Sequence, residues 1–306
     1  MRGRRLPVAV AAILAVLVAA GADAAVPPSG GPDLSTMALA ANDLGPGARI
    51  SAQGYRTPTE PAVASYEREF GPGVRLGGRP VLVVANTNDA FPDAGTAAQI
   101  FGELKDGLGT TAKRTAFGKA VVQGFNADSG GALRATLVGV GNLVPIPLGQ
   151  GAFRILIRMK TRIGTLDLAL GALLLDRALG LVVLASYPKK HIAAATTAAA
   201  LGKLAPHFQY GFTVRNLTPP TIAGTPQAGQ TLTADPGQWG GAPSSFAYQW
   251  SRCDANGANC TPIAGAVGQT YVLGTAEVGT RVSVTVTAAN TVTSQAMPAA
   301  ATTAVK

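Results

Sequence analysis

The sequence predicts an α+β domain, in which helices flank an antiparallel sheet, followed by an all-β sandwich. Residues 120–186 contain a series of short apolar runs separated by Gly- and Pro-rich turns, which is typical of antiparallel strands. Helical periodicity precedes this series, and Pro188 opens a further helix after it. Beyond residue 220 only short alternating segments remain, and a chain of 306 residues is long enough for two domains.

The first 24 residues have the features of a secretory signal peptide. Three arginines within the first five residues precede an apolar run over 6–20, and Ala22-Asp23-Ala24 fits the small-x-small cleavage rule. The run is shorter than the roughly 20 apolar residues that span a bilayer, so cleavage is favoured over retention as an anchor. Residues 25–32 are predicted to be a flexible leader. No later segment reads as a transmembrane helix, so we expect a secreted or cell-envelope protein.

The α+β domain is predicted to cover residues 33–212. Its first half is expected to contain a short helix over 33–43, a strand at 49–53, a strand or short helix at 62–70, a strand at 79–85 and an amphipathic helix over 92–108. The helix assignment at 92–108 rests on Ala97, Ile100, Phe101 and Leu104, which share one side.

The second half of this domain is predicted to supply most of the sheet. The expected strands are 120–125, 133–140, 153–161, 165–175 and 179–186. Pro188 then opens a last helix that runs to about Leu204, since proline is well tolerated in a first helical turn. This order of elements is similar to that of exported α/β-sandwich domains of the PsbP-like and LpqN-like kind, including extracellular sensor domains of bacterial kinases. The opening string Met37–Ala48 also resembles such domains. The resemblance implies a ligand-binding or sensor role and transfers no functional residue.

The C-terminal part is predicted to consist of a linker at 213–220 and a β domain at 221–306. Pro219 and Pro220 favour extended chain in the linker. Strict alternation then places three aromatic side chains on one face of a strand and three valines on one face of another, as in an antiparallel sandwich; they are Phe246, Tyr248 and Trp250, and Val282, Val284 and Val286.

The chain has two cysteines, Cys253 and Cys260, with six residues between them. In an exported protein this spacing predicts a disulfide, and two sulfurs without a nearby histidine do not complete a zinc site. Asn256-Gly257 lies between them and is a strong hairpin-turn signal. We therefore expect the disulfide to join the strands on either side of this turn.

The segment from Pro219 to Asn290 resembles an Ig-like module of secreted actinobacterial proteins. The matching residues are Ile222–Leu232, Tyr248-Gln-Trp250, the Cys-x6-Cys loop and Ala276–Gly279. The resemblance implies an adhesion or recognition module rather than an enzyme. We expect Trp250 to pack in the core of the module rather than to bind a ligand.

Four basic residues, Arg154, Arg158, Lys160 and Arg162, occupy even positions of the strand predicted at 153–161 and the residue after it. The odd positions are apolar, so a regular strand would bury them and present a basic row on its other face. The formal net charge of the chain is +9, and its excess lies outside the neutral C-terminal segment. The row is either a surface for an anionic partner, such as an envelope polymer or an acidic ligand, or an ordinary solvated sheet face. No aromatic residues alternate with these bases and the protein is exported, so nucleic acid is not expected as a partner.

No catalytic constellation is predicted. Asp128-Ser129-Gly130-Gly131 resembles the nucleophile string of trypsin-like proteases, but both histidines, His191 and His207, lie downstream of it, and His191 is expected to be a solvated surface residue. The sequence has no nucleotide-binding, metalloprotease or calcium-loop motif, so neither cofactor nor metal is expected. The favoured interpretation is a non-enzymatic, ligand-binding or sensor-like protein with an Ig-like module. The alternative is a secreted hydrolase, which a pocket with converging carboxylates or a buried ionisable pair would favour.

Overall fold

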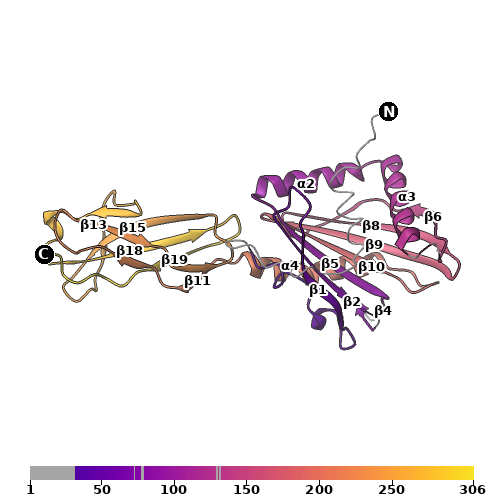
Figure 1. The fold of residues 1–306 in the computed structure, drawn as a ribbon, viewed down its shortest axis with the longest axis horizontal. Helices are drawn as coiled ribbons and strands as arrows, with labels where there is room; N and C mark the ends of the chain where they lie inside the picture. The colour runs from indigo at the N-terminus through magenta and orange to yellow at the C-terminus, as the bar shows by residue number, and fades with distance from the viewer. Residues whose placement is uncertain (1–31, 72, 77–78, 129, 131) are drawn as a thin grey trace. The chain divides into compact units, whose positions relative to one another are not determined.

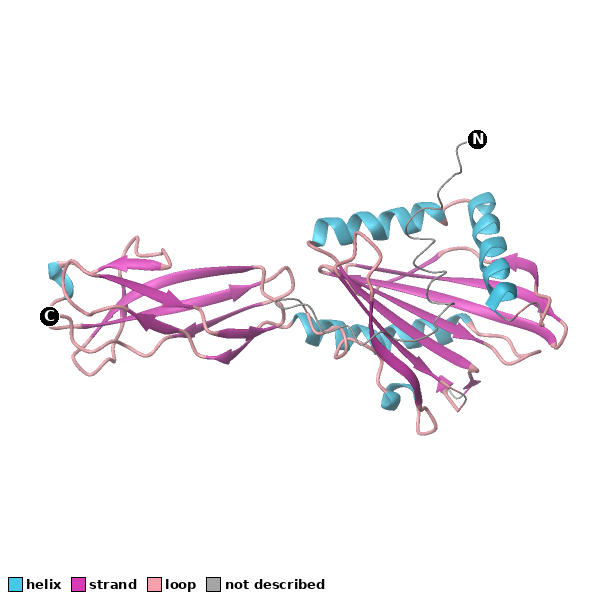
Figure 2. Ribbon diagram, in the orientation of Figure 1, coloured by secondary structure: helices cyan, strands magenta, loops and turns pink. Residues whose placement is uncertain are grey.

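A computed structural model describes residues 32–71, 73–76, 79–128, 130 and 132–306 of the chain. The predicted signal peptide and residues 25–31 of the predicted leader lie outside this part. The chain forms two compact units, one extending to Gln209 and the other comprising Tyr210–Lys306. Both are rich in antiparallel strands, and the first also carries helices (Figures 1 and 2).

The first unit is built on a single antiparallel sheet. Its strands follow the order β1-β2-β5-β10-β9-β8-β6, and β7 also pairs with β8. The strands are β1 (Ile50–Arg56), β2 (Ala64–Phe70), β5 (Val83–Ala90), β6 (Thr136–Val140), β7 (Val144–Ile146), β8 (Gly151–Thr161), β9 (Gly164–Leu175) and β10 (Ala178–Ala185). Two short strands, β3 (Arg75–Leu76) and β4 (Arg79–Pro80), pair separately. The predicted α+β class with an antiparallel sheet is confirmed.

Helices cover both faces of this sheet (Figure 1). On one face, α2 (Ala94–Gly107) and α3 (Thr111–Asp128) pack on a core to which β8, β9 and β10 contribute, and we call this the α2 face. The buried apolar side chains of β8 on this face are Phe153, Ile155, Ile157 and Met159, as the alternation predicted. On the other face, the α4 face, lies α4 (Ala194–Phe212).

Two glycines allow α4 to approach the sheet closely. A Cβ atom added to Gly171 of β9 would lie 2.9 Å from Cδ1 of Leu201, and one added to Gly180 of β10 would lie 2.7 Å from Cζ of Phe208. The central strands are buried on both faces for this reason, and they read in the sequence as continuous apolar runs rather than as alternating ones.

The short helix predicted at 33–43 is not formed. Turns and a 3-10 helix, η1 (Ala41–Leu44), replace it. Side chains of the sheet hold this segment in place: Asn86 Oδ1 accepts from the Leu39 N–H at 2.9 Å, and Arg68 Nη1 donates to the Leu39 carbonyl at 3.0 Å. Because strand side chains satisfy these backbone groups, the segment needs no helical hydrogen bonds.

Other predicted elements differ in type or limits. The strand predicted at 120–125 is wrong, because these residues belong to α3, where Phe117, Val121 and Phe125 recur at helical spacing. The strand predicted at 79–85 is interrupted at Val81 and continues as β5 to Ala90, and the last helix begins and ends later than predicted. The segment 62–70, for which two alternatives were open, contains strand β2.

Apart from the last three residues of α4, the second unit is all-β, with η2 (Thr275–Glu277) as a single 3-10 turn among its described elements. Strands β11 (Arg215–Thr218) and β14 (Gln238–Gly240) pair, so the predicted linker is partly a strand. A second sheet contains β12 (Thr221–Ala223), β13 (Thr231–Asp235) and β17 (Thr270–Val272). The third contains β16 (Thr261–Pro262), β15 (Ser245–Cys253), β18 (Arg281–Ala289) and β19 (Ser294–Pro298).

The core of the second unit lies between strands of these sheets. Leu232 of β13 packs with Trp250 of β15 and with Val282 and Val284 of β18. The predicted core position of Trp250 is confirmed: its side chain is fully buried, and its Nε1–H donates to the Gly268 carbonyl at 2.8 Å. The indole therefore has its polar group satisfied inside an apolar core.

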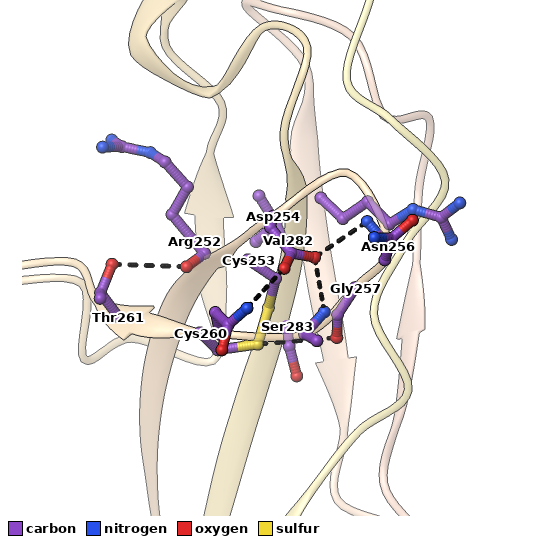
Figure 3. Close-up of a disulfide and its surroundings, with 12 residues drawn as sticks. Arg252, Cys253, Asp254, Asn256, Gly257, Cys260, Thr261, Val282 and Ser283 are labelled. Atoms are coloured by element: carbon purple, nitrogen blue, oxygen red, sulfur yellow. Dashed lines mark hydrogen bonds between the residues drawn. A yellow bond between two sulfur atoms is a disulfide. The ribbon is translucent and has the colours of Figure 1, made fainter.

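A disulfide joins Cys253, at the end of β15, to Cys260, which directly precedes β16 (Figure 3). Asp254 organises the loop between them. Its Oδ1 accepts from the N–H groups of Asn256 and Ala258, both at 2.9 Å. Gly257 has φ +80°, a left-handed value that favours glycine. The loop is thus closed by a covalent bond and by hydrogen bonds to one carboxylate, which lower the pKa of Asp254.

Candidate functional site

The basic row lies on the α4 face of β8. Arg154, Arg158 and Lys160 belong to the strand, whereas Arg162 lies in the turn after it. The strand itself therefore carries three of the four predicted bases. Arg158 is not available to a partner, because its Nε and Nη2 donate to Asp167 of β9 at 2.7 and 3.0 Å. A surface for an anionic partner therefore has to be built from the remaining bases and others near them.

Asp167 is a fully buried carboxylate that the sequence analysis did not single out. Besides Arg158, it accepts from the Ile192 N–H at 3.1 Å, and its Oδ2 lies 3.2 Å from Nδ1 of His191. Burial acts to raise the pKa of Asp167, but the hydrogen bonds from Arg158 and Ile192 outweigh it and hold the pKa below its usual range. The His191 side chain is 59% exposed, so the expectation of a solvated residue is incomplete: one edge contacts Asp167.

Three acidic side chains gather on the α2 face of the sheet. They are Glu67 and Glu69 of β2 and Asp89 of β5, and with Arg56 of β1 we call them the carboxylate cluster. Glu67 of β2 lies opposite Thr87 of β5. Ser65 of β2 lies opposite Asp89 of β5 on one side and opposite Arg56 of β1 on the other. Thr87 and Asp89 share a face with the core residue Ala85, since side chains two residues apart point to the same side of a strand.

The cluster is electrostatically unusual. Glu67 is 5% exposed and forms an ion pair with Arg56. Burial raises the pKa of Glu67 to about 7 despite Arg56, and the neighbouring Glu69 and Asp89 add to the effect. Burial likewise raises the pKa of Asp89 to about 6, against a hydrogen bond from Ser65 and the charge of Arg56. Groups with such shifts gather at functional sites more often than elsewhere.

Two buried polar atoms at this place have no hydrogen-bond partner within the described part of the chain. They are Oε1 of Glu67 and Oγ1 of Thr87, and Thr87 is also 5% exposed. Buried polar atoms are nearly always hydrogen-bonded, because leaving one unpaired costs about 1–3 kcal/mol. The two atoms belong to directly paired residues on one face of the sheet.

A small apolar pocket, with room for about one water molecule, lies between α2 and the sheet. Its lining includes Leu104, Leu108, Phe153, Ile155, Leu181 and Val183. Leu181 of β10 is the cross-strand partner of Thr87, which is the partner of Glu67. One row across three strands therefore runs from the apolar pocket to the ionisable cluster.

The sequence held a partial signal for this site. Glu67 and Glu69 alternate in a segment that could have been a strand or a helix, and the polar run Asn86–Asp89 follows the apolar Val83-Val84-Ala85. Their meeting depends on β2 pairing with β5, which no local pattern specifies. Among the described residues there is no group of three or more side chains that could hold a metal ion. In the same residues no helix is long and apolar enough to span a membrane.

Comparison with known proteins gives little further information. No protein-family model matches the chain, and no curated protein matches it. Among solved structures, the chain is similar to the extracellular domain of PknH from Mycobacterium tuberculosis, with a TM-score of 0.33 and 10% sequence identity. The match covers 56% of this chain and 92% of that one. At this level of similarity the match assigns neither a family nor a function.

Proposed function

We propose that the protein is an exported, non-enzymatic binding protein whose first unit holds a small ligand on its α2 face. The ligand carries a cationic group, which contacts the carboxylate cluster. The observation that carries the proposal is the cross-strand pair Thr87–Glu67 beside Glu69 and Asp89, whose buried Oγ1 and Oε1 atoms have no hydrogen-bond partner in the described part of the chain.

The sign of the ligand charge follows from the cluster itself. Three carboxyl groups face one guanidinium, so the ionised cluster has an excess of negative charge although the whole chain is basic. An ammonium group placed there would stabilise the ionised carboxylates and donate to Glu67 Oε1 and Thr87 Oγ1. An anionic ligand would meet like charge in a partly desolvated place, which is unfavourable.

A matched pair of small molecules tests this proposal. The full chain, labelled with 15N, is titrated with hexylammonium and with hexanoate, which are unbranched molecules of six carbons each and opposite charge. We expect hexylammonium to shift amide resonances of β2, β5 and β10 at pH 8, and hexanoate to shift them much less. Equal effects of the two molecules, or shifts confined to other strands, would overturn the proposal.

A second candidate function is hydrolysis, and the carboxylate cluster is the observation that favours it. A carboxyl group with a pKa of about 7 has the protonation behaviour of a general acid, and Asp89 is a second carboxyl group nearby. The test is turnover of a panel of chromogenic glycosides and esters by the full chain. Turnover that Glu67→Gln abolishes would establish the hydrolase, whereas its absence over the panel would favour simple binding.

The second unit is proposed to be an Ig-like adhesion or recognition module. The buried Trp250, the closed Cys253–Cys260 loop and the sheets packed around one core support this proposal. Export is supported by the basic and apolar start of the chain and by the disulfide, which persists in oxidising compartments.

A further inference from the structure

One end of the sheet in the first unit gathers exposed basic side chains from three separate segments. They are Arg134, Lys160, Arg162, Lys189 and Lys190, and we call them the basic end. Two of these residues, Lys160 and Arg162, belong to the predicted basic row. The other three are distant in the sequence, so their contribution to one surface is visible only in the fold.

Backbone hydrogen bonds bring the three segments together at the turn between β8 and β9. The Arg162 N–H donates to the Leu133 carbonyl at 3.0 Å, which places Arg134 beside this turn. The Lys189 N–H donates to the Thr165 carbonyl at 2.9 Å. Gly164 lies so close to Lys189 that an added Cβ atom would be 3.0 Å from Cγ of the lysine. The gathering of charge is therefore fixed by the backbone and not by side-chain rotamers.

Little negative charge opposes these bases. Within the segments 132–136, 158–167 and 186–192, Asp167 is the single acidic residue. It is fully buried and already engaged by Arg158, Ile192 and the His191 ring. The basic end is thus a positive surface that no exposed acid of these segments neutralises, and such surfaces attract anions.

We propose that the basic end binds an anionic glycan polymer, whose repeating carboxylate or phosphate groups contact several of these bases at once. A polymer is favoured over a single small anion because the bases are long, exposed side chains, and the buried Thr161, Asp167 and Ser186 of these segments are engaged in hydrogen bonds within the fold. A chain of anions gains from many weak contacts made together. A lipid surface is disfavoured, since Ile163, 52% exposed at the turn, is the single large exposed apolar side chain of these segments and buries too little area for insertion.

The test compares two double variants that remove the same charge. Lys189→Ala with Lys190→Ala removes two bases of the basic end, and Lys119→Ala with Lys203→Ala removes two exposed lysines of α3 and α4. Binding of the full chain to immobilised alginate is measured at low salt and again at about 0.3 M salt, where such contacts are screened. We expect wild type to bind at low salt and to be released at high salt. The first variant should bind about tenfold more weakly, and the second should bind like wild type.

Four results would overturn the proposal. They are no binding of wild type to alginate at low salt, equal weakening by both variants, displacement by millimolar inorganic phosphate, and tighter binding to vesicles rich in anionic lipid than to alginate. Equal thermal unfolding midpoints of the three proteins establish that the variants are folded. These outcomes do not depend on the carboxylate cluster, so the test is independent of the proposed ligand site on the α2 face.

Discussion

Glu67 has a buried carboxyl group whose ionisation the fold opposes. Its pKa is raised to about 7 in the folded chain, whereas an unperturbed glutamate ionises near 4.5. Between these values the folded state binds more protons than the unfolded state. The stabilisation that this group contributes is therefore fully present below about pH 4.5 and is lost as the pH rises through about 7. The half-buried Asp89, with a pKa raised to about 6, changes in the same direction.

Glu67→Gln is expected to remove the contribution of Glu67 to this pH dependence. The glutamine is neutral at every pH, so the free energy of unfolding of the variant, relative to wild type, should rise between pH 5 and pH 8 by an amount on the order of 2 kcal/mol. Denaturant unfolding at several pH values measures this difference. Glu103→Gln, at an exposed position of α2, is the control for loss of a negative charge. A difference between Glu67→Gln and wild type that stays constant with pH would show that Glu67 ionises normally in the folded chain.

At the scale of elements, glycines determine where α4 can lie. The side chains of Leu201 and Phe208 occupy the space above Gly171 and Gly180, which a methyl group would fill. Pro188 predicted a helix here, but the sheet surface on which it packs could not be predicted, because the two glycines are isolated within apolar strands. The same holds for the carboxylate cluster. The sequence partly indicated the strands β2 and β5, but not the register in which they pair.

Gly180→Ala is expected to destabilise the first unit by about 2 kcal/mol, because the added methyl group overlaps the Phe208 ring and forces the helix to shift. Chemical denaturation followed by far-UV circular dichroism measures the loss. Gly139→Ala of β6 is the matched control, since a Cβ atom there would meet no atom within 4 Å. If both variants lost the same stability, the glycine at position 180 would not be required for helix packing.

The disulfide is expected to stabilise the second unit chiefly by reducing the conformational entropy of the unfolded chain. Closing a loop of eight residues is worth about 2–3 kcal/mol on the chain-entropy model, so Cys253→Ser with Cys260→Ser should lower the free energy of unfolding by that amount. Tryptophan fluorescence during denaturation reports the change, because Trp250 lies in the core of this unit. An unchanged unfolding midpoint would mean that the hydrogen bonds to Asp254 suffice to hold the loop.

For the whole molecule, sequence patterns predicted the class of each part better than its chemistry. Alternation and periodicity identified the antiparallel sheet, the helix over 92–108 and the buried Trp250, because these depend on residues near one another in the chain. The site on the α2 face depends on contacts across β2, β5 and β10, and Arg158 proved to be paired with a buried carboxylate of β9. The sign of the surface charge was predicted from the sequence, whereas the residues that form the exposed basic surface differ from the predicted row.

The most direct test of the proposed ligand site is calorimetric titration of hexylammonium into the full chain at pH 8, where the carboxylate cluster is largely ionised. We predict that Glu67→Gln weakens binding about tenfold, the effect of removing one charge-assisted hydrogen bond, while Glu103→Gln binds like wild type. Equal affinity of wild type and Glu67→Gln would contradict the assignment of the ligand site to the α2 face.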